Sequence, residues 1–329
     1  MVTTVALVLA GGTGTRLYPA SRSDRPKQFH AFGGEDSLLA RTVARTGFAD
    51  ETYVLTGDDY ADQVREHAPS AGVLVEPAAK DTGPALAYAA RIIREQVGDC
   101  VLLCLPSDHH VSGDFASVAG RACQVAVETE GLVTMGVEPT RPATGYGYIE
   151  PGEFAAGVAP VEQFREKPGA ATAEAFVAEG FLWNAGIFAW TPDAFLRECE
   201  GTPLDPVATA EDPAEGFDRA EAVSVDYAVL ERTEDAYVVP ADFEWDDLGS
   251  WDAFERLLTG DDAENAVLGD ALTIDASGNV VAADEKHVSL VGVDDLVVAA
   301  YDDRVLVVSK VEAQRVREVV SELRAQSRF

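Results

Sequence analysis

The chain has 329 residues, 47% of them hydrophobic, which is enough for one large domain with an appendage or for two domains. Its 57 acidic residues outnumber 25 basic ones, for a formal net charge of −32, which argues against a nucleic-acid partner because phosphates require a basic face. The first apolar stretch, VALVLA, is far shorter than the roughly 20 residues of a membrane span, so we expect a soluble, cytoplasmic protein.

The acidic composition also indicates a host environment. Self-repulsion between so many carboxylates is screened where salt near 1 M shortens the Debye length to about 3 Å, so the charge favours a halophilic origin. The four cysteines show no CxxC spacing and stand mostly in apolar surroundings, which predicts buried, reduced thiols. They are Cys100, Cys104, Cys123 and Cys199.

The first two thirds of the chain alternate short apolar runs with segments of helical period, which predicts an α/β fold with a mainly parallel sheet. In such folds ligands bind at the carboxyl ends of strands, where AGG and PSD stand in this sequence. The predicted strands are Val5–Leu9, Tyr53–Leu55, Val73–Val75, Val101–Leu105 and Leu132–Gly136, and the predicted helices are Ser37–Thr46, Gly83–Gln96 and Phe115–Thr129.

The composition changes at the acidic stretch TGDDAENAV, residues 259–267, which follows a less regular region from about residue 140. Beyond it, short alternating strands predict a small β appendage that a terminal helix closes. We therefore predict a catalytic domain over residues 1–260 and a small β domain over residues 261–329. The predicted appendage elements are strands Asn279–Ala282, Val288–Val291, Leu296–Tyr301 and Val305–Val308 and helix Glu312–Leu323.

The stretch LVLAGGTGTRLYPASRSDRPKQF, residues 7–29, joins a buried strand to a glycine loop rich in basic residues. It lacks the GxxxxGK pattern of a P-loop, and Leu17 stands where a dinucleotide fingerprint needs its third glycine. Glycines after a strand can form a simple turn or expose backbone amides to a phosphate. Arg16 and Lys27 favour the phosphate, because a turn needs no cations; Arg22 and Arg25 could serve the loop or merely the surface.

At this point the sequence resembles the sugar-1-phosphate nucleotidyltransferases, and PKQF is similar to the mannose-1-phosphate guanylyltransferase branch. Seven further motifs continue the resemblance in order over nearly the whole chain: EPAAKDTGPA, LPSDHHV, GYGYI, FREKP, WNAGIF, SVDYAVLE and WDDLGSW. The resemblance implies a nucleotide-diphospho-sugar transferase fold, that is, a Rossmann-like mixed, mainly parallel sheet flanked by helices, with a small C-terminal β appendage and a terminal helix.

The activity implied by the resemblance is transfer of a guanylyl group from GTP to mannose 1-phosphate, forming GDP-mannose and pyrophosphate. Another nucleotide and hexose 1-phosphate, giving dTDP- or UDP-sugars, remains an alternative, as does a non-catalytic sugar-nucleotide sensor. A dinucleotide-dependent oxidoreductase fails on the missing third glycine. The resemblance also implies a homodimer, and because the chain ends at Phe329, without a cupin-like domain, we expect no isomerase activity.

The same resemblance assigns candidate site residues. Asp108 and Asp247 would hold Mg²⁺, a hard cation that takes one or two protein carboxylates and completes its shell with water and phosphates; Asp246 remains the alternative to Asp247. Arg16 and Lys27 would be catalytic, neutralising the departing pyrophosphate. The nucleotide-binding candidates are Leu9, Ala10, Gly11, Gly12, Gly14, Thr15, Asp81, Thr82 and Gly83, and the sugar-phosphate candidates are Gly147, Glu166, Lys167 and Asn184.

Several of these residues also have structural interpretations. Asp81 or Thr82 could cap a helix, and GYGYI could form a β-bulge around Gly147. Adjacent histidines on an extended segment point to opposite sides, so His109 and His110 are not expected to chelate one ion. The aromatic residues of WNAGIF, Trp183 and Phe188, are expected in the core or in a pocket wall.

Overall fold

The computed structural model describes residues 2–258 and 260–329. Contacts between residues divide the chain into two compact units. Unit 1 comprises Met1–Gly11, Val43–Ser107 and Val111–Trp245, and unit 2 comprises Gly12–Thr42, Asp108–His110 and Asp246–Phe329. The chain thus leaves unit 1 shortly after the first strand, forms the loop of residues 12–29, called the basic loop below, within unit 2, and then returns to unit 1.

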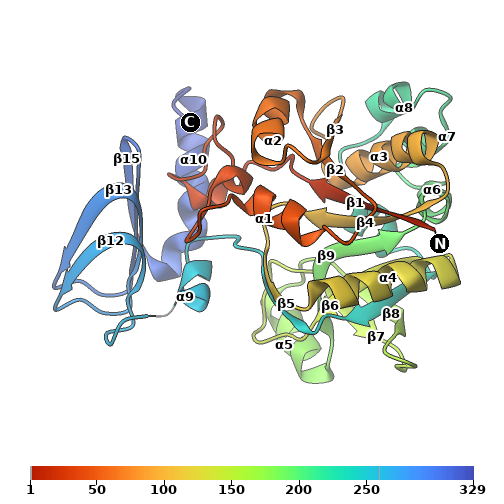
Figure 1. Ribbon diagram of the computed structural model, residues 1–329. Coiled ribbons are helices and arrows are strands. Elements are labelled where there is room, and N and C mark those ends of the chain that lie inside the picture. Colours follow the sequence, from red (N-terminus) through yellow and green to blue (C-terminus); the bar gives the residue numbers. More distant parts are fainter. Residues whose placement is uncertain (1, 259) are drawn as a thin grey trace. The chain divides into compact units, whose positions relative to one another are not determined.

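Unit 1 is built on a nine-stranded mixed sheet (Figure 1) in the order β3-β2-β1-β4-β9-β6-β10-β8-β7. The pairs among β3, β2, β1 and β4 are parallel, whereas β9 runs antiparallel to both of its neighbours β4 and β6. The strands are β1 (Thr3–Leu9), β2 (Glu51–Thr56), β3 (Gly72–Val75), β4 (Cys100–Pro106), β6 (Leu132–Val137), β7 (Tyr148–Pro151), β8 (Ala159–Arg165), β9 (Leu182–Trp190) and β10 (Ala236–Pro240).

Helices cover the sheet, with α3 on one side and α4 on the other (Figure 1). Because side chains alternate along a strand, Val5 and Leu7 of β1 share a core with α3, while Ala6 and Val8 point to the opposite face. The α/β prediction is therefore confirmed. The helices of unit 1 are α2 (Ala61–His67), α3 (Thr82–Val97), α4 (Phe115–Thr129), α5 (Ala170–Glu179), α6 (Pro192–Cys199), α7 (Asp205–Thr209) and α8 (Pro213–Arg219), with a π-helix at Asp226–Leu230. Helix α1 (Leu38–Arg45) begins in unit 2 and ends in unit 1.

The C-terminal part of unit 2 is a four-stranded sheet in the order β12-β13-β14-β15, parallel except for the last pair. The predicted strands Asn279–Ala282 and Val288–Val291 fall at the two ends of one long strand, β13 (Val280–Val291). The sequence predicts two strands instead of one because charged residues between them interrupt the apolar pattern. The elements of this part are α9 (Ala253–Leu257), β12 (Ala266–Ile274), β13 (Val280–Val291), β14 (Leu296–Tyr301), β15 (Arg304–Ser309), a 3₁₀ helix at Lys310–Arg315 and α10 (Val316–Ala325). Strands β5 (His110–Gly113) and β11 (Phe243–Asp246), which pair with each other, each have residues in both units.

The basic loop shares its core with these C-terminal strands. Leu17 and Tyr18 pack in one apolar cluster with Trp251, which is 0% exposed, and its indole N–H donates to the Tyr18 carbonyl at 2.8 Å. Arg22 forms ion pairs with Asp302 and Asp303 in the turn between β14 and β15. The sequence left open whether Arg22 serves the loop or is only a surface charge. In the structure its guanidinium joins the loop to the β appendage.

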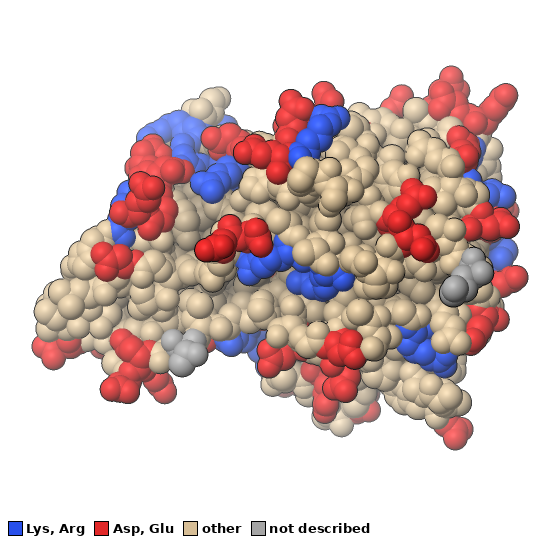
Figure 2. Space-filling view, viewed as in Figure 1, with Lys and Arg blue, Asp and Glu red and all other residues tan. Residues whose placement is uncertain are grey.

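The surface reflects the composition. Acidic side chains are spread over the face drawn in Figure 2, with fewer basic groups among them. Burial raises the pKa of each cysteine thiol, and all four cysteines are free and buried, as predicted. Within residues 2–258 and 260–329, no helix combines the length and the apolar character that crossing a membrane requires.

Candidate active site

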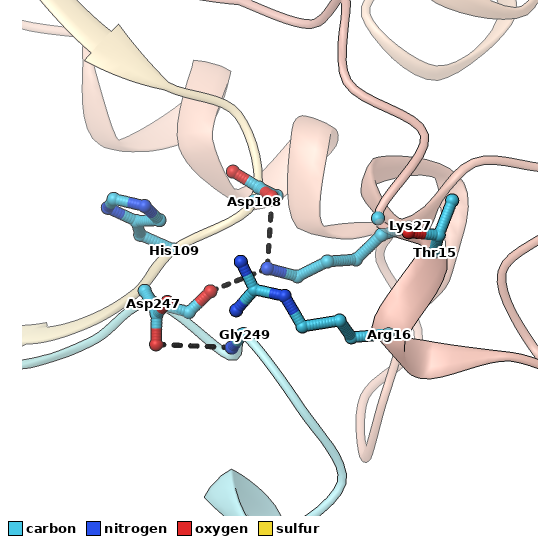
Figure 3. A pocket seen from close by; sticks show the side chains of 8 residues that line it. Thr15, Arg16, Lys27, Asp108, His109, Asp247 and Gly249 are labelled. Atoms are coloured by element: carbon cyan, nitrogen blue, oxygen red, sulfur yellow. Dashed lines mark hydrogen bonds and ion pairs between the residues drawn. The ribbon is translucent and has the colours of Figure 1, made fainter. Parts of the chain in front are cut away.

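A pocket of about 270 Å³ in unit 2 brings the strongest sequence candidates together (Figure 3). They come from three separate segments of the chain: the basic loop, the residues after β4, and the residues after β11. The pocket is lined by Gly14, Thr15, Arg16, Lys27, Asp108, His109, Asp247 and Gly249.

The fold of the loop depends on Gly14. Its φ is +62°, in the left-handed region, and a Cβ atom there would overlap the Cβ of Lys27. The hydroxyl of Ser21 donates to the Thr13 carbonyl and holds the loop in this tight curve. Only glycine therefore allows Lys27 to lie against the start of the loop.

Arg16 and Lys27 present their charges differently. Arg16 stands on a 3₁₀ turn, Thr15–Leu17, and its guanidinium extends across the pocket (Figure 3). Within the described part of the chain, this guanidinium makes no hydrogen bond or ion pair. Because acidic residues are so abundant in this protein, a cation without a carboxylate partner in a pocket favours binding of an anionic ligand.

Lys27 is 3% exposed, and its ammonium lies 2.9 Å from Asp108 Oδ2 and 2.5 Å from the Asp247 carbonyl oxygen. Burial alone would raise the pKa of Asp108, but the charges of Lys27 and His109 and the hydrogen bond from Lys27 hold it below its usual value. The carboxylate of Asp108 is therefore ionised. Burial lowers the pKa of His109, an effect that the Asp108 charge opposes.

The structure distinguishes the two adjacent aspartates that the sequence left unresolved. Asp246 is buried, and its Oδ1 accepts the Leu248 amide at 2.8 Å while its Oδ2 accepts Nε and Nη2 of Arg256 at 2.9 and 2.7 Å. Both oxygens of Asp246 are thus engaged within the protein. Asp247 lines the pocket instead, and its Oδ1 accepts the amide of Gly249 at 3.1 Å.

These oxygens form a site that suits a cation. Asp108 Oδ2 and the carbonyl oxygen of Asp247 already converge on one positive group, the ammonium of Lys27. Within the described ranges there is no group of three or more Asp, Glu, His or Cys side chains that could enclose a metal. Two carboxylates beside an open pocket fit Mg²⁺, which commonly completes its shell with water and substrate phosphates.

The four sugar-phosphate candidates come together in unit 1. A Cβ atom at Gly147 would lie 2.6 Å from Glu166 Oε2, so glycine is needed for this carboxylate to approach. The ammonium of Lys167 lies 2.5 Å from Glu166 Oε1, and the backbone N–H of Asn184 donates to the Gly147 carbonyl at 2.8 Å. Burial opposes the charge on Lys167, but Glu166 and Asp226 raise its pKa above the usual value.

The remaining nucleotide candidates divide between the two units. Leu9 ends β1, and Ala10 and Gly11 follow it in unit 1, whereas Gly12, Gly14 and Thr15 belong to unit 2. Asp81 caps α3, since its Oδ1 accepts the Thr82 amide at 2.7 Å, and its backbone has a φ of +68°. The capping alternative is therefore confirmed for Asp81, and a role in holding the nucleotide stays a prediction. Trp183 and Phe188 are core residues, as expected.

Sequence reasoning missed one further acid near these residues. Glu76 follows β3 and is only 9% exposed, and a Cβ atom at Gly11 would lie 3.0 Å from its Oε1. Among the described residues, its carboxylate has no hydrogen-bond partner, and burial raises its pKa from 4.5 to about 7. The one sequence signal for Glu76 is its position as the first residue of the motif EPAAKDTGPA.

Glu76→Gln is expected to stabilise the fold at pH 8 but hardly at pH 4.5. Between these values the unfolded carboxyl ionises while the folded one keeps its proton, so native stability falls as the pH rises to about 7. The difference at pH 8 should be at most about 3 kcal/mol. Urea unfolding at fixed high salt measures it, with the exposed Glu66→Gln as control; a pH-independent difference would contradict the assignment.

The fold and the pocket together define a nucleotidyltransferase. A glycine loop follows the first strand of a Rossmann-like sheet, and two cations meet two carboxylates beside it within unit 2. Residues 5–263 match the nucleotidyl transferase family, and residues 269–323 match the MannoseP isomerase/GMP-like beta-helix domain.

Individual relatives narrow this class. The xanthan biosynthesis protein XanB of Xanthomonas campestris pv. campestris is 37% identical over 98% of this chain and 73% of its own length. The mannose-1-phosphate guanylyltransferase of Escherichia coli strain K12 is 35% identical over 98% of this chain and 74% of its own. A crystal structure described as mannose-1-phosphate geranyltransferase from Thermus thermophilus has a TM-score of 0.91 and 36% identity, covering 98% of this chain and 100% of that one. The chain therefore belongs to the mannose-1-phosphate guanylyltransferase family.

Proposed function

We propose that this protein transfers the guanylyl group of GTP to mannose 1-phosphate, producing GDP-mannose and pyrophosphate. The observation that carries the proposal is the meeting of Arg16 and Lys27 with Asp108 and Asp247 in one pocket of unit 2. Cations for a triphosphate and carboxylates for a divalent metal are the two requirements of nucleotidyl transfer. Membership of the guanylyltransferase family supports the choice of GTP and mannose 1-phosphate.

In this reaction an oxygen of the sugar phosphate attacks the α-phosphorus of GTP, and the bond from that phosphorus to the β-phosphate oxygen breaks. The nucleophile is already ionised at neutral pH, so no general base is required. Two anions must be brought together, and catalysis rests on positioning and charge neutralisation. Arg16 and Lys27 would stabilise the charge of the departing pyrophosphate, and Lys167 would hold the sugar phosphate.

Asp108 and Asp247 would hold the magnesium ion. When bound, the ion would neutralise phosphate oxygens as a Lewis acid. The lowered pKa of Asp108 supports this role, because the carboxylate must be ionised to bind a cation. Asp246 is not proposed as a ligand, since its Oδ1 accepts from the Leu248 amide and its Oδ2 accepts from the Arg256 guanidinium.

Asp247→Asn is expected to change the magnesium dependence of the activity, whereas Asp246→Asn is expected to change the stability of the fold. Asp247→Asn should raise the magnesium concentration needed for half-maximal activity by about tenfold or more, with little change in stability. Asp246→Asn should destabilise the fold by about 1–3 kcal/mol, because it weakens a buried, charge-assisted pair with Arg256. Magnesium titrations and thermal unfolding of both variants test this; the reverse pattern would make Asp246 the ligand.

The activity itself is tested by incubating the purified chain with GTP, mannose 1-phosphate and Mg²⁺. We expect GDP-mannose, identified by mass, and pyrophosphate in equal amounts, and neither product when the metal is chelated. A chain that binds GDP-mannose but releases no pyrophosphate would instead be a sugar-nucleotide sensor.

We further propose that the protein works in the cytoplasm of a halophile, where GTP and high salt are both present. The formal charge of −32 supports this proposal, since such self-repulsion needs screening. Unfolding temperatures that fall as KCl is raised from 0.2 to 3 M would contradict it.

We also propose a homodimer. Val305 and Val307, on the outward side of β15, are 62% and 60% exposed, and water-exposed valines on an edge strand favour a protein contact. A monomeric mass by light scattering, in the salt that gives full activity, would contradict the proposal.

A further inference from the structure

The motif SVDYAVLE, residues 224–231, lies beside the sugar-phosphate candidates and contacts Asn184 through Asp226. Its residues Asp226–Leu230 form a π-helix, a rare turn that is frequent at functional sites. The segment is tied to the start of α3, since the Val225 amide donates to Thr82 Oγ1 at 3.0 Å and the Gly83 amide donates to the Val223 carbonyl at 3.0 Å. These bonds hold the π-helix in place.

Asp226 bonds directly to one of the sugar-phosphate candidates. The Asn184 side-chain amide donates from Nδ2 to Asp226 Oδ1 at 3.0 Å. The Asn184 side-chain oxygen accepts from Thr134 Oγ1 at 2.9 Å and from the Gly186 amide at 3.0 Å. Because a carbonyl oxygen has two lone pairs, this oxygen is fully used, and Asn184 can offer a ligand only its remaining N–H.

Among the side chains of this cluster, the carboxyl groups are therefore the available hydrogen-bond acceptors for a sugar. Glu166 is 8% exposed, and its carboxylate pairs with the ammonium of Lys167. The backbone N–H of Glu166 donates to Glu231 Oε1 at 2.9 Å. Burial and the nearby charge of Glu166 raise the pKa of Asp226 above its usual value. Two carboxylates near a single ammonium leave the cluster with an excess of acceptors.

A polyol supplies what such a cluster lacks. Hydroxyl groups on neighbouring ring carbons can each donate to a carboxyl oxygen, whereas a phosphate would be attracted to the ammonium of Lys167. The cluster can therefore orient a hexose 1-phosphate, with the ring hydroxyls on the acidic side and the phosphate on the basic side.

We infer that Asp226 is a further sugar-binding residue, whose carboxylate accepts a ring hydroxyl of the hexose 1-phosphate next to the hydroxyl bound by Glu166, while it also orients the Asn184 amide. This inference rests on the proposed function, because it assigns a contact to the sugar of that reaction. It deepens that function by giving the SVDYAVLE motif a role.

Asp226→Asn separates binding from orientation. An asparagine oxygen can still accept from Asn184 Nδ2, so the Asn184 side-chain amide keeps its orientation. The second carboxyl oxygen, which would accept from the sugar, is replaced by an amide NH2 group that only donates. We expect the KM for mannose 1-phosphate to rise about 10- to 100-fold while the KM for GTP changes less than about twofold. Asp218→Asn, which removes an exposed carboxylate from α8 of the same unit, is the matched control and should leave both constants unchanged.

Deoxy analogues identify the contact itself. Mannose 1-phosphate and its 2-deoxy, 3-deoxy and 4-deoxy analogues are compared as substrates of the wild type and of Asp226→Asn, at temperatures where both are folded. For one analogue, removal of the hydroxyl should lower kcat/KM about tenfold or more in the wild type but hardly in the variant. The variant has already lost the carboxyl oxygen that accepts from that hydroxyl, so removing the hydroxyl costs it little more.

Equal relative losses in both proteins for every analogue would overturn the role of Asp226, and so would an unchanged KM for mannose 1-phosphate. A wild type that transfers no nucleotidyl group to any hexose 1-phosphate would instead refute the proposed function.

Discussion

Lys27→Met should lower the rate of pyrophosphate release by about 100- to 1000-fold, the cost of removing one preorganised charge from a transition state. The side chain is buried, and its ammonium is directed at Asp108 and at the Asp247 carbonyl. Methionine keeps the apolar stem of the lysine but removes the charge that would stabilise departing pyrophosphate. Initial rates at saturating GTP and mannose 1-phosphate measure the effect.

The matched control is Lys286→Met. Lys286 also pairs with an aspartate in unit 2, Asp284, at 2.9 Å, but it lies outside the pocket and is 38% exposed. Its replacement should leave the rate within about twofold, because an exposed ion pair contributes about 1 kcal/mol at most. A Lys27→Met enzyme that keeps a third or more of the wild-type rate would remove Lys27 from the mechanism.

Ending the chain at residue 260 should abolish at least about 99% of the activity, because a loop displaced by about 1 Å can already cost 100-fold in rate. The sequence predicts a catalytic domain over residues 1–260. In the structure, however, the loop residues Leu17 and Tyr18 share an apolar core with Val297 and Tyr301 of β14. Removing residues 261–329 would expose this core and release the loop that carries Arg16 and Lys27.

Limited trypsin digestion measures the loop directly, since trypsin can cleave after Arg16, Arg22 and Lys27. We expect rapid cleavage between residues 16 and 27 in the truncated chain and protection in the full chain. The double variant Val305→Ser/Val307→Ser is the control, because these side chains point away from the core. If the appendage serves only dimerisation, this variant should lose as much activity as the truncation.

Much of the fold could be predicted because its signals are local. The predicted helix Phe115–Thr129 has the bounds of α4, and the predicted strands of the first half each lie within an observed strand. The appendage was harder, since the charged residues Asp284–Lys286 interrupt the apolar pattern of β13. Strand β12 was missed, and its pairing with β13 shifts register between Leu268 and Asp270.

The candidate site was predictable as two groups of residues, but not in its internal connections. Sequence motifs supplied the pocket residues and the sugar-phosphate candidates, and the structure brings each of these two groups together within one unit, whereas the nucleotide candidates divide between the units. Adjacent aspartates cannot be distinguished by local pattern, because Asp246 is engaged by Arg256 from a helix that follows it. Likewise, the pairing of Asp226 with Asn184 joins segments about 40 residues apart and has no local signal.

A competition assay tests the central claim most directly. The purified chain is given equimolar GTP, ATP, UTP and dTTP together with mannose 1-phosphate and glucose 1-phosphate, and all nucleotide sugars formed are identified by mass and chromatography. Guanylyl transfer to mannose 1-phosphate predicts GDP-mannose as the main product, formed in step with pyrophosphate and lost in Lys27→Met. A predominance of UDP- or dTDP-sugars, or the absence of any nucleotide sugar, would contradict it.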